Sequence, residues 1–169
     1  MTMKKHIFTI LFMTLSQLLW ADIIKFQTPK LSGKLVSENI ELTDWQAVLN
    51  CRFQLNGKNQ ESSKYPLTVL KKIDDNQYEL SIKAANLIEA LPNLEIQNCH
   101  YKLILIGKLY STRQTLFGEI ILFGQDQGKM SDKDLDILNN KNQLAKILQD
   151  KAKEIKISAG ADGGIVLDE

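Results

Sequence analysis

The chain contains few of the side chains from which most catalytic and metal sites are built. It has two histidines and two cysteines among 169 residues. Zinc sites that use several histidines or closely spaced cysteines therefore cannot form. Neither a Gly-x-Ser-x-Gly elbow nor a His-Glu-x-x-His helix is present. These absences exclude the common metallohydrolases and the best-known serine hydrolases, and we expect neither a metal nor a cofactor.

An excess of charge of one sign is also missing. The chain carries 21 basic and 20 acidic side chains, and no stretch of it is densely basic. A nearly neutral protein has no overall field that would attract nucleic acid or anionic lipid. We therefore expect no nucleic-acid partner.

Long apolar runs are absent except near the start of the sequence. Residues 1–21 begin with Lys4 and Lys5, continue through a short, mostly apolar run at residues 7–15, and close at Ala21. This order is typical of a cleavable secretory signal peptide, whereas a membrane span needs about 20 apolar residues. We predict a protein that begins near Asp22, has no membrane span after cleavage, and is periplasmic or extracellular.

Cys51 and Cys99 are the only cysteines. An even number of cysteines in an exported chain favours a disulfide, and their wide separation argues against a redox pair or a zinc site. His100 follows Cys99 directly, which raises the possibility of a Cys-His catalytic pair. Successive side chains on a strand point to opposite faces, so we predict a structural disulfide and interpret His100 as a solvent-side strand residue.

Alternation of apolar and polar residues predicts strands through most of the chain. In residues 45–55 the apolar positions recur at every second residue and place Cys51 on the core face. Two further runs flank the turn formers Asp74, Asp75 and Asn76, which predicts a β-hairpin. Other strands are expected at residues 94–110 and 115–123, a polar loop at residues 58–64, and a short helical stretch within residues 84–91.

The segment Leu103–Ile106 is apolar at every position. In a strand, this means that both faces carry apolar side chains. Strands of this kind are usually covered on both sides. We therefore expect a helix over the middle of the sheet.

The C-terminal part changes to helical spacing. Ser131 and Asp134 resemble a capping box, and apolar residues at three- and four-residue intervals predict an amphipathic helix over about residues 131–156. The weak helix formers of residues 139–142 can divide it. The glycine-rich residues 158–169 are expected to form a flexible tail of little consequence for stability; alternatively, residues 165–167 could add an edge strand.

Together these patterns predict a single mainly β domain over residues 22–157, either an antiparallel β-sandwich or a curved sheet with a C-terminal amphipathic helix. One hypothesis for its function is an exported, non-catalytic binding or assembly protein of a bacterial envelope that holds a protein partner or a glycan. The other is a small exported hydrolase that uses carboxylates such as Asp74, Asp75 or Glu119. The first is favoured, since the chain lacks the residue clusters of common hydrolases.

Overall fold

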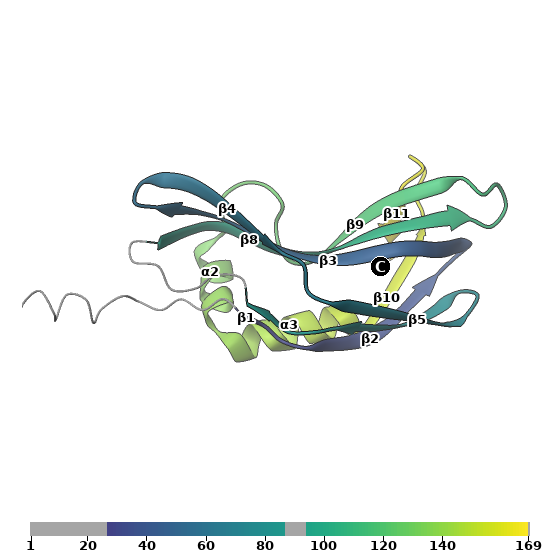
Figure 1. Cartoon of the computed structure of the whole chain (residues 1–169), viewed down its shortest axis with the longest axis horizontal. Coiled ribbons are helices and arrows are strands. Elements are labelled where there is room, and N and C mark those ends of the chain that lie inside the picture. Colours follow the sequence, from purple (N-terminus) through teal and green to yellow (C-terminus); the bar gives the residue numbers. More distant parts are fainter. Residues whose placement is uncertain (1–26, 87–93, 169) are drawn as a thin grey trace, which may run out of the picture.

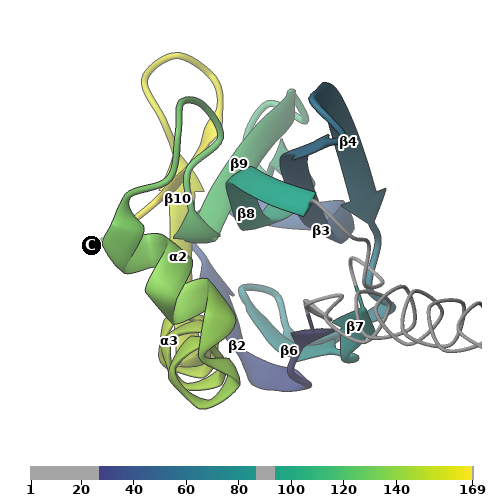
Figure 2. The same cartoon turned by 90° about the vertical axis from the view of Figure 1, so that its left-hand side faces the viewer.

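The computed structural model describes residues 27–86 and 94–168 and shows a mainly β fold with two helices. The expected signal peptide lies outside the described residues. Of the helical stretch expected within residues 84–91, Ala85–Asn86 instead forms the short strand β7, and residues 87–91 lie outside the described part. The predicted fold class is confirmed: two antiparallel-rich sheets face each other (Figures 1 and 2).

The upper sheet of Figure 1 contains four antiparallel strands in the order β4-β3-β8-β9. The long strands β3 and β8 pair along almost their whole length and run the full width of the molecule. The strands are β3 (Ile40–Leu55), β4 (Lys58–Lys64), β8 (Leu94–Leu109) and β9 (Thr115–Gly124).

The lower sheet contains five strands in the order β11-β10-β2-β6-β5. Its one parallel pair joins β2 to β10, and the predicted hairpin is the pair of β5 and β6. The strands are β2 (Leu31–Ser37), β5 (Thr68–Asp74), β6 (Gln77–Ile82), β10 (Glu154–Ala159) and β11 (Ile165–Leu167). A separate two-stranded sheet pairs β1 (Gln27–Thr28) with β7 (Ala85–Asn86).

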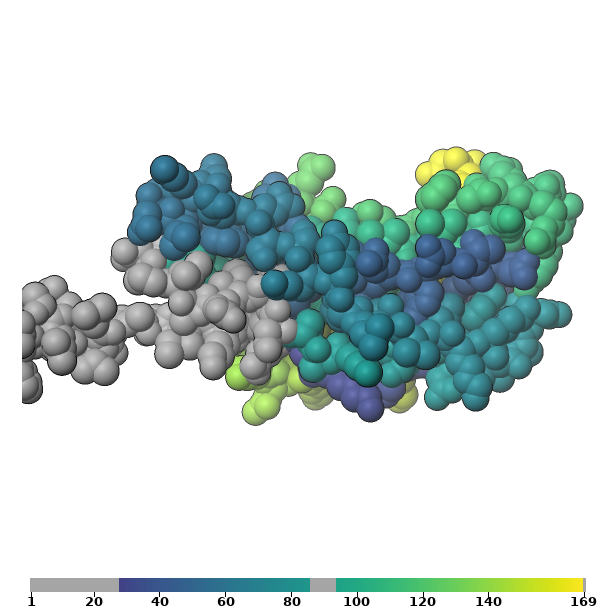
Figure 3. All heavy atoms as spheres, viewed as in Figure 1, coloured from purple at the N-terminus to yellow at the C-terminus, as the bar shows by residue number. Residues whose placement is uncertain are grey.

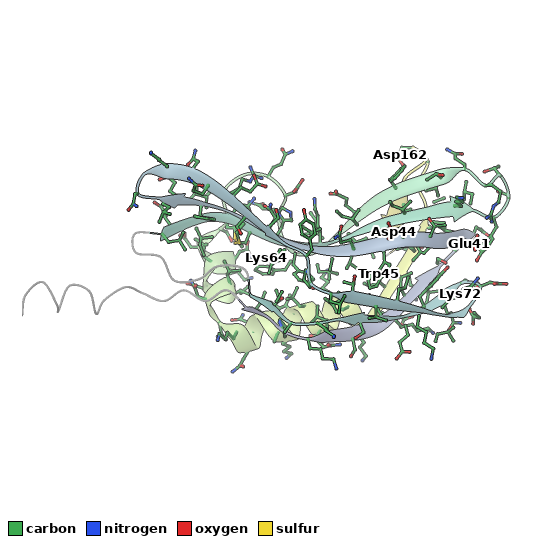
Figure 4. All side chains as sticks on the ribbon, viewed as in Figure 1. Glu41, Asp44, Trp45, Lys64, Lys72 and Asp162 are labelled. Carbon is green, nitrogen blue, oxygen red and sulfur yellow. A yellow bond between two sulfur atoms is a disulfide. The ribbon has the colours of Figure 1, made fainter. Side chains whose placement is uncertain are left out.

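The core lies between the two sheets because apolar residues alternate along their strands. Leu49 and Leu103 of the upper sheet and Leu80 of the lower sheet are among its fully buried members. Figure 4 shows this alternation on β3, where Trp45 lies below the ribbon and Asp44 above it. Each strand of the upper sheet therefore has an inner face toward the core and an outer face directed away from the lower sheet.

The disulfide between Cys51 and Cys99 is confirmed. The two residues are directly opposite each other on β3 and β8, with their Cα atoms 4.1 Å apart. This spacing is typical of the close, non-hydrogen-bonded positions of an antiparallel pair. Both side chains are fully buried on the inner face, so the bridge fixes the register of the two central strands from inside the core.

The predicted helix is divided into α2 (Asp132–Asn139) and α3 (Lys141–Lys153). Ser131 caps α2 as expected: its Oγ accepts a hydrogen bond from the Asp134 N–H and donates one to the Asp134 carboxylate. Asn140 ends α2 and caps α3 by accepting from the Gln143 N–H. The predicted end at residue 156 is wrong, because Ile155 belongs to β10, which continues directly from α3.

Helix α3 packs against the edge of β2. A methyl group at Gly33 would overlap the Ala152 carbonyl oxygen, so only glycine permits this close approach. The Gln149 side chain accepts a hydrogen bond from the Ser32 N–H at 3.3 Å and donates one to the Ser32 carbonyl at 2.6 Å. The amide of Gln149 therefore takes the place of a neighbouring strand at Ser32, before β10 begins to pair at Lys34.

Two predictions of irregular structure are wrong. Residues 58–64 form β4, an edge strand of the upper sheet whose side chains are almost all exposed. Residues 158–168 are not a flexible tail either, since β11 pairs with β10 and the Ile165 side chain is only 4 % exposed. A methyl group at Gly118 of β9 would overlap Ile165, which shows how closely β11 packs on the upper sheet. The edge-strand alternative for residues 165–167 is confirmed.

Candidate functional site

The outer face of the upper sheet is bent near its centre. The pairing of β3 with β8 shifts between Arg52 and Phe53, where β8 has one extra residue. The pairing of β8 with β9 shifts between Tyr101 and Lys102, where β9 has one extra residue. Bulges of this kind bend a strand and increase its twist. In Figures 1 and 3 the two ends of this sheet rise above its middle. Side chains that point outward at the bend are therefore brought together.

A pocket of about 380 Å³ lies at this bend. Its floor comes from outward positions of β3 and β8, where Asn50 is directly opposite His100 and Val48 opposite Lys102. Its walls come from β4, the segment after it, and the loop between β9 and α2, which rises beside the sheet (Figure 2). The lining residues are Val48, Asn50, Arg52, Glu61, Tyr65, His100, Lys102, Ile104 and Asp126.

His100 lies at the floor of the pocket and is only 4 % exposed. Neither ring nitrogen has a hydrogen-bond partner, although Asp126 Oδ1 lies 3.4 Å from Nε2. Burial lowers the pKa of His100, and the nearby Asp126 carboxylate opposes this effect only in part. The prediction of a solvent-side residue was right about the face and wrong about exposure, because the bend and the loop cover the ring.

Buried polar atoms without partners are unusual in folded proteins and call for an explanation. Leaving such a group unpaired costs roughly 1–3 kcal/mol. His100 lines an open pocket, so a ligand that displaces the groups covering the ring could supply the missing hydrogen bond. This makes the pocket a better candidate for a binding site than its size alone would suggest.

Of the two basic side chains in the pocket, Lys102 forms ion pairs and Arg52 forms none with the described residues. Lys102 Nζ lies 2.8 Å from Glu119 Oε2 and 3.6 Å from Asp126 Oδ1. Burial opposes the charge of Lys102, but the hydrogen bond to Glu119 and the charges of Glu119 and Asp126 outweigh it and raise the pKa of Lys102. Arg52 donates a hydrogen bond to the backbone carbonyl of Asp126. Within the described part of the chain, no carboxylate oxygen lies within 4.0 Å of the Arg52 guanidinium.

Asn50 is held in place by β4. Its amide nitrogen donates to Glu61 Oε1 and to Ser63 Oγ, each at 2.7 Å. Asn50 therefore lies between Ser63 and His100 in the row of side chains across the sheet. This order separates the serine hydroxyl from the imidazole, so the two do not form a nucleophile and base.

An apolar strip adjoins the pocket on the outer face. It consists of Ile104, Ile106, Phe117 and Ile121, which we call the outer strip; Ile106 and Phe117 are direct cross-strand neighbours. Phe117 is 62 % exposed and Ile121 40 % exposed. The expectation of a helix over this part of β8 is wrong, since α3 packs instead on β2 and the edge of the core.

The carboxylates considered for hydrolysis lie in two separate places. Asp74 and Asp75 are at the β5–β6 turn, where Asp74 accepts from the Asn76 N–H and Asp75 pairs with Lys72. Glu119 is on the outer face and pairs with Lys102. Cys99 and His100 lie on opposite faces of β8, as predicted, so they do not form a catalytic pair either.

No known protein family, curated protein or solved structure matches this chain. In residues 27–86 and 94–168, no group of three or more histidine, cysteine or acidic side chains could hold a metal ion, and no helix there has the length and hydropathy of a membrane span.

The sequence patterns did not predict the pocket, although one signal for it is present in the sequence. If Cys51 pairs with Cys99 across two antiparallel strands, Asn50 must be near His100, and both must point away from the core. That register alone places a polar pair at the centre of the outer face. The bend and the covering loop, which bury His100, had no comparable signal.

Proposed function

We propose that the protein is an exported, non-catalytic binding or assembly protein of a cell envelope, and that it holds a protein partner on the outer face of its upper sheet. The observation that carries this proposal is the exposed outer strip beside a pocket with a buried histidine whose ring nitrogens make no hydrogen bond with the described residues. In an antiparallel sheet with one solvated face, the outward positions are normally polar. Here several of them are large and apolar.

A protein partner accounts for both parts of this surface. Exposed apolar side chains grouped together mark sites of interaction, and aromatic residues such as Phe117 are enriched at the centres of interfaces. The pocket adds hydrogen-bonding groups that could fix the orientation of the partner. A glycan would use the polar pocket but would leave most of the outer strip uncovered.

The outer strip should be required for binding. We expect Phe117→Asp to reduce capture of the partner from an envelope extract of the host by at least about tenfold, because a charge would have to be buried against apolar surface. Phe117 is 62 % exposed in the free protein, so the substitution should leave the fold intact. The measurement is quantitative mass spectrometry of captured proteins, supported by thermal melts of each variant.

Val69→Asp is the matched control. Val69 lies on β5 of the lower sheet and is 52 % exposed. The substitution therefore introduces the same charge at an apolar surface position outside the outer face. Capture should be unchanged by this variant. Equal losses for the two variants, or no loss for either, would contradict the proposed binding face.

Export is the other part of the proposal, supported by the order of residues 1–21 and compatible with the disulfide. We expect the protein purified from its host to begin at or near Asp22 and to be absent from the cytosol. N-terminal sequencing after cell fractionation measures both. Recovery of intact Met1 in a cytosolic fraction would show that residues 1–21 are not a signal peptide.

A further inference from the structure

The pocket on the outer face contains hydrogen-bond donors that its own residues do not fully use. The Arg52 guanidinium has a backbone carbonyl as acceptor but no ion-pair partner among the described residues. His100 is buried, and both of its ring nitrogens lack hydrogen bonds. A planar group with two acceptor oxygens and one negative charge would satisfy both side chains, since carboxylates pair with guanidinium groups through two parallel hydrogen bonds.

Asp126 shows that a carboxylate suits this part of the pocket. One of its oxygens lies 3.4 Å from His100 Nε2 and 3.6 Å from Lys102 Nζ. The Asp126 side chain is 48 % exposed, and it comes from a loop rather than from the sheet. It can therefore turn toward water when another carboxylate takes its place, and the incoming group would gain the Arg52 guanidinium as an additional partner.

We propose that the pocket binds the carboxylate of an acidic side chain on an extended segment of the partner protein, anchored by Arg52 and His100 and displacing the Asp126 side chain. This inference depends on the proposed function and names the partner's chemistry at the same site. The ligand is a peptide rather than a small carboxylate because the outer strip continues from the pocket along β8 and β9 and offers apolar surface to further side chains.

The spacing of the outward side chains indicates which sequence pattern the partner segment should have. Outward side chains of β8 recur at every second residue, from His100 and Lys102 at the pocket to Ile104 and Ile106 in the outer strip. An extended peptide has the same spacing of roughly 7 Å between alternate side chains. An acidic residue followed by apolar residues two and four positions later would therefore place its carboxylate in the pocket and its apolar side chains on the strip.

The test uses the peptide acetyl-Asp-Thr-Val-Thr-Phe-amide and its neutral counterpart with Asn in place of Asp. Binding to the exported form of the protein is followed by NMR of the His100 ring, which is the only histidine in residues 22–169. We expect the Asp peptide to bind about tenfold more tightly, or better, because a charge-assisted pair replaces a neutral hydrogen bond. Equal affinity for the two peptides would overturn the proposal.

Variants assign the effect to the named residues. Arg52→Gln should abolish the preference for Asp, and Arg52→Lys should retain part of it, since the charge remains and the planar fork is lost. Asp126→Asn should strengthen binding of the Asp peptide several-fold, because a competing carboxylate is removed. Arg113→Gln is the control: Arg113 is exposed, lies outside the pocket and pairs with Glu41. Loss of preference in the control, or weaker binding in Asp126→Asn, would contradict the assignment.

Two further probes separate the possible origins of the carboxylate. Acetate and glucuronate carry the same charge without the apolar residues, so they should bind much more weakly than the Asp peptide. If glucuronate binds as tightly as the peptide, an acidic glycan is the ligand and the peptide proposal is wrong. If Asp and Asn peptides bind equally while Phe117→Asp still prevents capture, this inference fails and the proposed function stands; if Phe117→Asp has no effect on capture, the proposed function itself fails.

Discussion

A protein that lacks residues 158–169 is expected to lose roughly 3 kcal/mol of stability. These residues include the end of β10 and all of β11, whose Ile165 is 4 % exposed and packs beside Gly118. Burial of a large aliphatic side chain contributes about 1.5–3 kcal/mol. The pairing of β10 with β11 and the hydrogen bond from Ser158 to Asp168 are lost as well. Urea unfolding followed by circular dichroism measures the difference.

Point variants identify the part of the segment that matters. Ile165→Ala should cost about 2–3 kcal/mol, the low end for truncation of a buried isoleucine and most of the effect of the deletion. Val166→Ala should change stability by less than about 0.5 kcal/mol because Val166 is 40 % exposed. Removal of residues 131–169 should prevent folding, since Leu144, Leu148 and Ile157 are then also lost from the core. A deletion of residues 158–169 that leaves the unfolding midpoint unchanged would show that β11 does not stabilise the domain.

Removal of the disulfide should have the other large effect. The double variant Cys51→Ala/Cys99→Ala is expected to be about 4 kcal/mol less stable, because the bridge spans a sequence separation of 48 residues and restricts the unfolded chain. The two cysteines are fully buried opposite each other, so smaller side chains there also leave space in the core. The free energy of unfolding without reductant is the quantity to compare.

The reduced wild-type protein provides the control for this variant. Reductant should lower the stability of the wild type to about that of the double variant and should leave the double variant itself unchanged. A difference of less than about 1 kcal/mol between oxidised wild type and double variant would contradict the expected role. Such a result would mean that the pairing of β3 with β8 is stable without the bridge.

The sequence predicted the strands in which buried and exposed side chains alternate. Strand β3 has a core face and an outer face, and its alternation is readable in the sequence. Strand β4 was not predicted because it has no apolar residue and almost all of its side chains are exposed, so its sequence shows no alternation. Strand β10 was missed because Ile155 and Ile157 follow α3 without a glycine or proline, and the first of them fits the helical spacing equally well.

The candidate site was harder to predict than the fold. Ile104 and Ile106 are plainly apolar in the sequence, but this pattern predicts a covering helix, because packing within the domain is the usual reason for apolar side chains. Only the path of α3 along β2 shows that no helix covers them. The surroundings of His100 likewise come from distant segments of the chain. Asp126 and Asn50, which lie next to His100, belong to different parts of the sequence.

The parallel pairing of β2 with β10 also has a consequence for how the chain folds. Lys34 pairs with Glu154, which are 120 positions apart in the sequence. Contacts between such distant residues form slowly, because the chain must close a long loop before the pair becomes stable. During synthesis or transport, β2 has no partner on this edge until the segment from α3 to β10 has emerged. The lower sheet can therefore be completed only late, and until then the chain exposes apolar surface that chaperones or proteases of its compartment can recognise.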